Sequence, residues 1–351
     1  MQTATFALLI FLLLWILPGM ADQAITEDAN FAIRKGLEYL VRKQCLEPGK
    51  DFGAFYTDFE EKKYAVATTS FACLAFLANG SIPGQGKYGK QISYGLDFIL
   101  SCVGRNGYIS RLDDESRMHG HGFAVLFLAE TYGMLPDSGR SQQIYETLKK
   151  ATALILQSQT DDGGWGYLPG DKLHEGSITV CELQALRSAR NVGIRVPKQS
   201  IDRAVEYLRR SANPDGSFKY RLGMTRAHAS FPLTAAGVSS LNATGEYDSQ
   251  EIQRGLDFMM RYLPLQGKED DYYKAFYFYG QFYAAQAMYQ APPGYWEKWY
   301  PNIRQDLIKR QRSDGSWGSN LEEQRFGPVY PTAVASLILQ IPYHYLPIFQ
   351  R

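Results

Sequence analysis

The sequence has almost no excess of charge of either sign. Its 351 residues include 37 basic and 36 acidic side chains, so the net charge is +1. Nucleic-acid-binding domains are usually clearly basic, and this balance therefore gives no indication of a nucleic-acid partner. The chain also lacks a Gly-rich phosphate loop, a Gly-x-Ser-x-Gly elbow and a paired-histidine zinc-protease motif. No nucleophilic triad can be assembled from the sequence either.

Cysteine is scarce. The four cysteines are Cys45, Cys73, Cys102 and Cys181, and no two of them have zinc-finger spacing. Cys73 and Cys181 lie in apolar runs, which is typical of small buried side chains. Cys45 and Cys102 fall near the ends of neighbouring helical segments and are candidates for a disulfide, although the sequence does not fix the pairing.

Long apolar runs are also few, and the clearest is Phe6–Leu17 near the N-terminus. Its length is that of a signal-peptide core rather than of a membrane span, and Gly19-Met20-Ala21 supplies small residues for cleavage after Ala21. We therefore predict a signal peptide over residues 1–21 and an extracytoplasmic mature chain, either secreted or periplasmic, over residues 22–351. No Lys or Arg precedes the run, so an uncleaved N-terminal anchor stays open as the one membrane contact.

The most informative stretch is Gln159–Tyr167, which recurs near the C-terminus as Gln311–Gly318. Both copies contain Gln, three residues, Gly, one residue and Trp, and Ala212–Phe218 is a weaker copy. Asp-Gly after a helix stops the helix, because glycine adopts positive φ without steric strain. A recurrent turn of this kind indicates an internal repeat.

Similar segments begin near residues 36, 95, 151, 204, 255 and 303, which gives six repeats with a period near fifty. Each repeat contains an amphipathic helix, a turn with glycine and an aromatic residue, and a second helix that is apolar nearly all round. The fifth repeat has residues 266–271 in place of the turn. The predicted apolar helices are 65–78, 122–129, 178–186, 231–241, 275–289 and 332–341.

A helix that is apolar on every side is buried on every side. Six pairs, each with one such helix, predict an inner ring of apolar helices and an outer ring of amphipathic helices. Neither end of the array carries an obvious polar capping repeat, which an open solenoid needs. We therefore expect the first repeat to pack against the sixth. The predicted fold is all-α, a single (α/α)6 toroid.

The turns at Gln159/Gly163/Trp165 and Gln311/Gly315/Trp317 resemble the Gln-Trp repeats of the terpenoid cyclase and protein prenyltransferase superfamily. The resemblance extends over about residues 28–345. It implies an (α/α)6 toroid with a central cavity that opens at the N-terminal ends of the inner helices. A packing signature does not fix a reaction, however.

The catalytic motifs of that superfamily are not reproduced. In place of the Asp-x-Asp-Asp acid motif of squalene–hopene-type cyclases, the nearest stretch is Lys268-Glu269-Asp270-Asp271. In place of the Asp-x-Cys zinc pair of prenyltransferase β-subunits, Thr179 stands two residues before Cys181. Whether the chain is an enzyme therefore stays open.

Histidines precede three consecutive inner helices: His119 and His121 the second, His174 the third and His228 the fourth. His121, His174 and His228 are candidate ligands for a divalent metal such as zinc, and His119 and His228 are candidate ligand-binding residues. His121, His174 and the adjacent Glu175 are also candidate catalytic residues, with Glu175 as a base. The alternative is that these histidines only hydrogen-bond to neighbouring helices.

The fifth inner helix follows Asp270 and Asp271, which are candidate acids or helix-capping residues. The helix itself is rich in aromatic residues, and Tyr272, Tyr273 and Tyr277 are candidate ligand-binding residues that could equally fill the core. Arg117 and Arg226 lie near other inner-helix starts and are candidates for holding an anion.

These observations predict an exported toroid that binds an apolar or polymeric ligand in its central cavity. Two other functions stay open. One is a terpenoid cyclase-type enzyme that uses Asp270 or Asp271 as its acid. The other is a polysaccharide-active enzyme or a metal-dependent hydrolase at a cavity mouth lined by histidines.

Overall fold

The computed structural model describes residues 25–56, 63–135, 137–224, 230–263, 271–318 and 320–349. Helices form nearly all of the regular structure in these residues, and only isolated β-bridges accompany them. None of the described helices is long and apolar enough to cross a membrane. The predicted signal peptide and its cleavage site lie outside the described residues.

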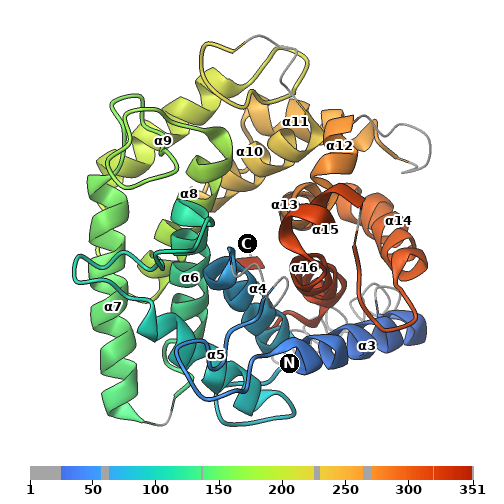
Figure 1. The fold of residues 1–351 in the computed structure, drawn as a ribbon. Helices are drawn as coiled ribbons and strands as arrows, with labels where there is room; N and C mark the ends of the chain where they lie inside the picture. The colour runs from blue at the N-terminus through green and yellow to red at the C-terminus, as the bar shows by residue number, and fades with distance from the viewer. Residues whose placement is uncertain are drawn as a thin grey trace, which may run out of the picture.

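The helices form two concentric layers (Figure 1). The inner layer contains α4 (Ala65–Leu77), α6 (Arg117–Thr131), α8 (Gly176–Asn191), α10 (Phe231–Ala243), α13 (Tyr277–Gln290) and α16 (Val329–Gln340). The outer layer contains α3 (Glu27–Lys43), α5 (Gly89–Ser101), α7 (Ser138–Gln157), α9 (Lys198–Ser211), α11 (Gln250–Met260) and α14 (Tyr295–Arg310). Short helices α12 (Asp271–Ala275) and α15 (Asn320–Phe326) precede the last two inner helices, and two 3-10 turns, η2 (Ile341–Tyr343) and η3 (Pro347–Phe349), follow α16.

The ring is closed. Each inner helix contacts the next one along the chain, and α16 returns to contact both α4 and α3 (Figure 1). In the outer layer α14 contacts α3. The predicted (α/α)6 toroid of six helical pairs is therefore confirmed.

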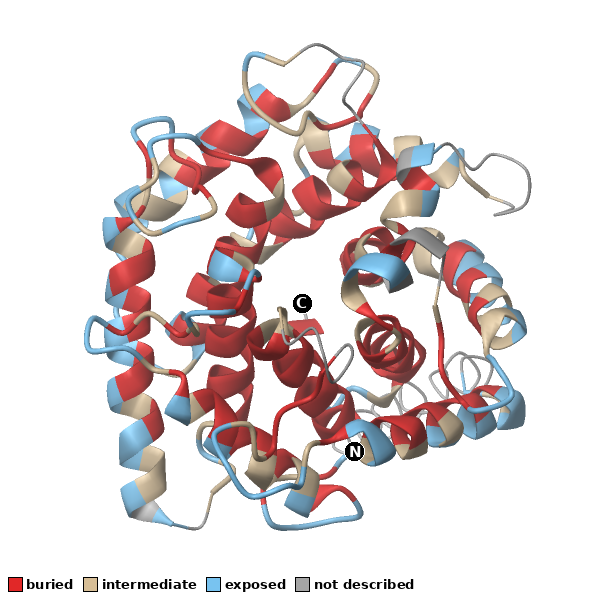
Figure 2. Cartoon of the chain, in the orientation of Figure 1, coloured by how far each residue is buried: buried red, intermediate tan, exposed pale blue. Residues whose placement is uncertain are grey.

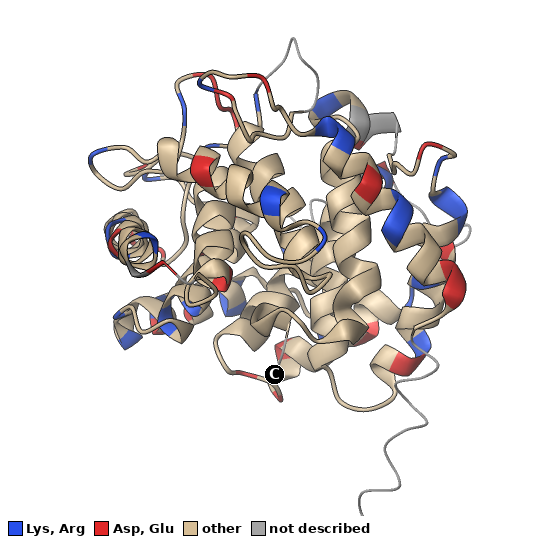
Figure 3. Cartoon of the chain, turned by 90° about the horizontal axis from the view of Figure 1, so that it is seen from below, with Lys and Arg blue, Asp and Glu red and all other residues tan. Residues whose placement is uncertain are grey.

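Burial follows the two layers. Almost every residue of α4 is buried, whereas α9 buries Ala204, Tyr207 and Leu208 and exposes Arg209 and Arg210 (Figure 2). Charged residues are correspondingly concentrated on the outer helices and the loops, and the central helices carry few (Figure 3). The difference in hydrophobic pattern between the two helices of each repeat thus decides which one lies inside.

The Gln159 turn joins one repeat to the next. The side-chain amide of Gln159 donates to the carbonyl oxygens of Gly163, at 2.9 Å, and of Ser200 in the first turn of the next outer helix, at 2.8 Å. The indole nitrogen of Trp165 donates to the Ile155 carbonyl at 2.7 Å, and its backbone N–H donates to the Thr179 hydroxyl at 3.1 Å. One turn therefore connects its own two helices and the following repeat.

The Gln311 turn makes the same bonds across the closure of the ring. Gln311 donates to the carbonyl of Ala32 in α3 at 2.8 Å, and Trp317 packs against Gly36 of the same helix. Gln44 is a first-repeat counterpart, because it donates to the carbonyls of Gly53 at 3.0 Å and Gln91 at 2.9 Å. The longer spacing between Gln44 and its glycine conceals this copy in the sequence.

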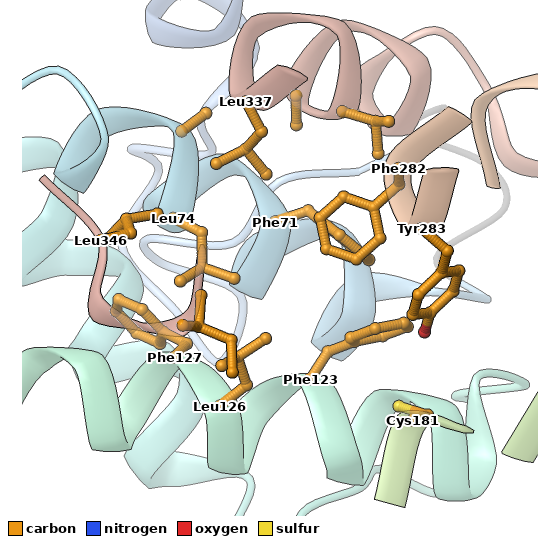
Figure 4. Close-up of a cluster of buried hydrophobic side chains, with 14 of the residues drawn as sticks. Phe71, Leu74, Phe123, Leu126, Phe127, Cys181, Phe282, Tyr283, Leu337 and Leu346 are labelled. Carbon is orange, nitrogen blue, oxygen red and sulfur yellow. The ribbon is translucent and has the colours of Figure 1, made fainter. Parts of the chain in front are cut away.

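Aromatic and aliphatic side chains fill the centre of the ring (Figure 4). The ring of Phe71 lies 4.4 Å from that of Phe123 and 5.2 Å from that of Phe282, so three inner helices meet there. The C-terminal segment adds Leu346 and Phe349, both buried, and the ring of Phe349 lies 6.3 Å from that of Phe282. The ring is therefore plugged at one end.

The inner helices differ in detail from the predicted ranges. Several begin earlier, and the fifth is broken at Phe276 into α12 and α13. The buried carboxylate of Glu322 accepts from the backbone N–H groups of Phe278 at 3.0 Å and Tyr279 at 3.3 Å, and so caps the start of α13. The suggested pairing of Cys45 with Cys102 is wrong for this structure, since all four cysteines are free thiols.

We predict that Trp317→Ala destabilises the protein by about 3–5 kcal/mol, because a fully buried indole and its hydrogen bond are lost. Trp165→Ala should have a similar effect, since the buried Trp165 indole makes the equivalent hydrogen bond in the third repeat. Urea unfolding measures both changes, and Trp296→Ala, at a half-buried position, is the milder control. Full stability of Trp317→Ala beside a strongly destabilised Trp165→Ala would show that the ring is open.

Candidate functional site

A cavity of about 540 Å³ occupies the unplugged end of the ring. Its wall comes from the first two turns of the six inner helices, together with α15 and the segments that precede α6, α8 and α10. The cavity therefore lies at the N-terminal ends of the inner helices, where the family resemblance implies it.

Aromatic side chains form much of this wall. They are Tyr64, Phe71, Phe123, Tyr167, Tyr220, Phe276, Tyr279, Phe326 and Tyr330. Several pack edge to face, as in Phe71 with Tyr330, whose ring centroids lie 5.2 Å apart at 77°. Phe71 and Phe123 also belong to the cluster of buried side chains that fills the centre of the ring. The floor of the cavity is therefore apolar (Figure 4).

Charged residues stand at the rim of the cavity rather than on its floor. Glu115, Arg117 and Arg325 line it and are exposed. Glu115 lies 3.9 Å from the ammonium of Lys63, whereas the Arg117 guanidinium has no hydrogen-bond or ion-pair partner among the described residues. Arg117 has φ +52°, a left-handed conformation that is uncommon for a non-glycine residue. The candidate Arg117 is thus placed at the cavity.

The two histidines of α6 have different surroundings. His119 lines the cavity, with its ring 6.3 Å from that of Phe123 and 5.8 Å from that of Tyr167. His121 is fully buried away from the cavity wall, where Nδ1 accepts from the backbone N–H of Ile109 at 3.1 Å and Nε2 lies 3.3 Å from the Ala151 carbonyl. Burial lowers the pKa of both imidazoles to about 4, so both are neutral near pH 7.

His174 also lies outside the cavity wall. Its Nδ1 is 3.0 Å from the Tyr207 hydroxyl and its Nε2 is 3.3 Å from a carboxylate oxygen of Asp162. Burial lowers its pKa in spite of the nearby Asp162. Within the described ranges no group of three or more His, Cys, Asp and Glu side chains is arranged to hold a metal ion. Of the three predicted zinc ligands, His228 lies outside those ranges, and both ring nitrogens of His121 and of His174 already have partners.

Glu175 is connected to the cavity by hydrogen bonds through two tyrosines. Its buried carboxylate pairs with Arg221 and accepts from the Tyr220 hydroxyl. The Tyr220 and Tyr167 hydroxyls are 2.9 Å apart, and both tyrosines line the cavity. This candidate residue therefore acts on the cavity by orienting Tyr220 and Tyr167 and does not itself form part of the wall.

Two of the aromatic candidates on the fifth inner helix belong to the core. Tyr273 is buried against Phe231 and Tyr262, with ring centroids 5.1 and 5.5 Å away, and Tyr277 donates to Asp306 of the outer helix α14. Asp271 begins α12, is exposed and is not part of the cavity wall. Asp270, Arg226 and the side chain of Tyr272 lie outside the described residues.

Most of the residues that line the cavity were not among the candidates predicted from the sequence. Tyr167 and Tyr220 each follow the aromatic residue of a repeat turn by two positions, a regularity that would have marked them. Tyr279 lies two residues beyond Tyr277, and two residues along a helix turn its side chain from the outer layer toward the cavity. The number of aromatic residues in a helix does not tell which of them face the cavity.

Comparison with known proteins supports this architecture. The family model of the squalene-hopene cyclase C-terminal domain matches residues 134–297. The solved structure of the type II terpene cyclase MstE from Scytonema, in complex with geranylgeranyl dihydroxybenzoate, is similar with a TM-score of 0.60 and 14% identity, over 91% of this chain and 98% of the cyclase. The chain therefore has the α/α toroid fold that this cyclase also has.

The same toroid fold also occurs in sugar-active enzymes. A D-mannose isomerase has a TM-score of 0.64 to this toroid at 11% identity, over 91% of this chain and 97% of the isomerase. A reducing-end-xylose releasing exo-oligoxylanase has a TM-score of 0.57 at 12% identity, over 93% and 94% of the two chains. No curated protein sequence matches the toroid. At these identities the likeness shows the fold and leaves the reaction open.

One acidic residue of the toroid stands out for its surroundings. Glu182 lies on the inner helix α8 with no exposed surface, and neither of its carboxyl oxygens has a hydrogen-bond partner among the described residues. A β-carbon on Gly122 of α6 would lie 3.3 Å from Oε1, so the glycine leaves room for the carboxyl group. Burial raises the pKa of Glu182 well above its ordinary value of 4.5, which keeps the group protonated.

This buried acid should make the stability of the toroid depend on pH. Because the folded-state pKa is raised, the stabilisation is fully present below the unfolded value of 4.5 and is lost as the pH rises toward the folded-state pKa. Glu182→Gln cannot ionise and should remove this component. We expect the free energy of unfolding of the wild type to fall relative to that of the variant as the pH rises from about 5, by up to about 1.4 kcal/mol per pH unit.

Urea unfolding of both proteins across this pH range measures the difference, and changes at other titrating groups cancel in the comparison. Parallel pH profiles for the two proteins would mean that Glu182 ionises in the folded state without penalty, and the interpretation of a neutral buried acid would then be wrong.

Proposed function

We propose that this toroid binds one apolar organic molecule of isoprenoid character in its central cavity. The observation that carries the proposal is the cavity itself, about 540 Å³ in volume, plugged at one end and lined by aromatic side chains from the inner ring. Small-molecule sites usually have volumes of about 300–1,000 Å³ and mostly apolar walls with a few polar groups. Here the polar groups are the tyrosine hydroxyls, His119 and the charged rim.

The comparisons support the chemical class of this ligand. The structures of MstE contain geranylgeranyl dihydroxybenzoate in one case and merosterolic acid A in another. Aromatic walls favour such molecules through apolar burial and through the faces of the rings. The plug at one end argues against a polymer, because a long chain needs a cleft that it can pass along.

Binding is better supported than acid catalysis. Glu115 is the only carboxylate that lines the cavity in the described part of the chain, and it is exposed beside Lys63. A catalytic acid for carbocation chemistry needs a carboxyl group whose pKa is raised by apolar surroundings, close to the substrate. Glu182 has such a pKa, but it does not line the cavity.

Filling the cavity should abolish binding. Ala67 of α4 lines the wall, and Ala67→Trp would place an indole in the space that the ligand needs. We expect at least about tenfold weaker binding of geranylgeraniol, measured by its displacement of the fluorescent probe anilinonaphthalene sulfonate. Leu173→Trp adds the same indole at an exposed position outside the cavity and is the matched control. Equal affinities for geranylgeraniol in the wild type and both variants would show that the ligand does not bind in this cavity, and the proposal would then be wrong.

We also propose that the protein works outside the cytoplasm. The support is the apolar run Phe6–Leu17 followed by the small residues Gly19-Met20-Ala21. Expression of the full chain in a secreting host should give a mature protein that begins at residue 22. Intact-mass measurement of the purified protein tests this, and a mass that still includes Met1 would instead identify the run as an N-terminal anchor or as an unprocessed segment.

A further inference from the structure

The hydrogen bonds behind the cavity wall have a fixed direction. Glu175 is paired with Arg221, which is always charged, so its carboxylate only accepts hydrogen bonds. The Tyr220 hydroxyl must therefore donate its hydrogen to Glu175. The Tyr220 oxygen is then left to accept from Tyr167, 2.9 Å away.

This order determines what Tyr167 can offer to the cavity. The Tyr167 hydroxyl uses its hydrogen in the bond to Tyr220. Only the lone pairs of the Tyr167 oxygen therefore remain for a ligand. Burial raises the pKa of both Tyr167 and Tyr220, so both hydroxyls keep their hydrogens near neutral pH. Tyr167 thus presents a hydrogen-bond acceptor.

Tyr279 differs from Tyr167, because the hydrogen of its hydroxyl is not used in a bond to another described side chain. It lines the cavity from α13, and its buried hydroxyl has no hydrogen-bond partner among the described residues. A buried hydroxyl without a partner is unfavourable, and in native proteins such a group usually bonds to a water or a ligand. Tyr279 and Tyr167 line the same cavity, Tyr279 from α13 and Tyr167 from the segment that precedes α8. The Tyr279 hydroxyl therefore still has its hydrogen to donate to a ligand.

We propose that the cavity recognises an alcohol, whose hydroxyl donates its hydrogen to Tyr167 and accepts one from Tyr279. The rest of the ligand lies against Phe71 and Phe123 on the apolar floor. This inference rests on the proposed function and specifies its ligand: a hydroxyl group satisfies both tyrosines, an ether or a carbonyl satisfies only Tyr279, and a hydrocarbon satisfies neither.

The test uses three probes with one carbon skeleton: geranylgeraniol, its methyl ether and the corresponding hydrocarbon. Affinities for the mature protein are measured by displacement of anilinonaphthalene sulfonate. The ratio of alcohol to ether affinity reports the acceptor Tyr167, and the ratio of ether to hydrocarbon affinity reports the donor Tyr279. We expect each ratio to be about five- to tenfold in the wild type, the effect of one net hydrogen bond.

Single hydroxyl deletions assign each ratio to its residue. Tyr167→Phe should bring the ratio of alcohol to ether close to one, which also shows that the bulk of the ether methyl group is not the cause. Tyr279→Phe should bring the ratio of ether to hydrocarbon close to one. Tyr295→Phe is the matched control, because it removes the same group from the outer helix α14, outside the cavity, and it should leave both ratios unchanged.

Affinities of the three probes within twofold of one another in the wild type would overturn the inference, because the two tyrosines would then bind water only. Ratios that survive the tyrosine deletions would overturn it as well. Failure of all three probes to bind, in the wild type and in Ala67→Trp alike, would instead remove the proposed function. Thermal unfolding checks that each variant is folded, and the wild-type ratios decide the matter even if a variant is not.

Discussion

The whole ring depends on a close approach between the glycine of each repeat turn and the backbone of the next outer helix. In each case φ is positive, and an added β-carbon would collide with that backbone. The pairs are Gly53 with Tyr94, Gly107 with Lys150, Gly163 with Arg203, Gly216 with Arg254 and Gly315 with Lys35. This contact fixes how each helical pair is rotated relative to the next. The contact of Gly315 with Lys35 joins the sixth repeat to α3, the first described helix.

A closed ring brings the starts of all the inner helices to one end, and this creates the cavity. The same geometry separates the two chemical parts of the site. The floor is made where Phe71, Phe123 and Phe282 meet, whereas hydroxyl groups and charges gather higher up, where the helices begin and the loops enter. The plugged end prevents passage through the ring, so a ligand enters and leaves by the same opening.

The sequence was sufficient for the fold but not for the site. Glycine and tryptophan at fixed spacing revealed the repeats, because the turn tolerates few other residues, and the apolar helices identified the inner ring. Position within the wall depends instead on helical phase and on contacts between distant segments. His119 and His121 are two residues apart, and one faces the cavity while the other bonds to the backbone of Ile109. The hydrogen-bonded path from Glu175 to Tyr167 joins side chains whose order in the sequence gives no sign that they meet.

The closure of the ring also constrains the order in which the protein folds. The carbonyl of Ala32 accepts a hydrogen bond from Gln311, and Gly36 packs against Trp317. Both partners of α3 are therefore separated from it in sequence by most of the chain. Bonds between neighbouring repeats span far shorter loops and form at a smaller cost in chain entropy. Consecutive pairs can therefore assemble as they emerge during synthesis, but α3 must keep its apolar face uncovered until the last pair has been made. We therefore expect the seam between the first and sixth repeats to form after the contacts between consecutive pairs.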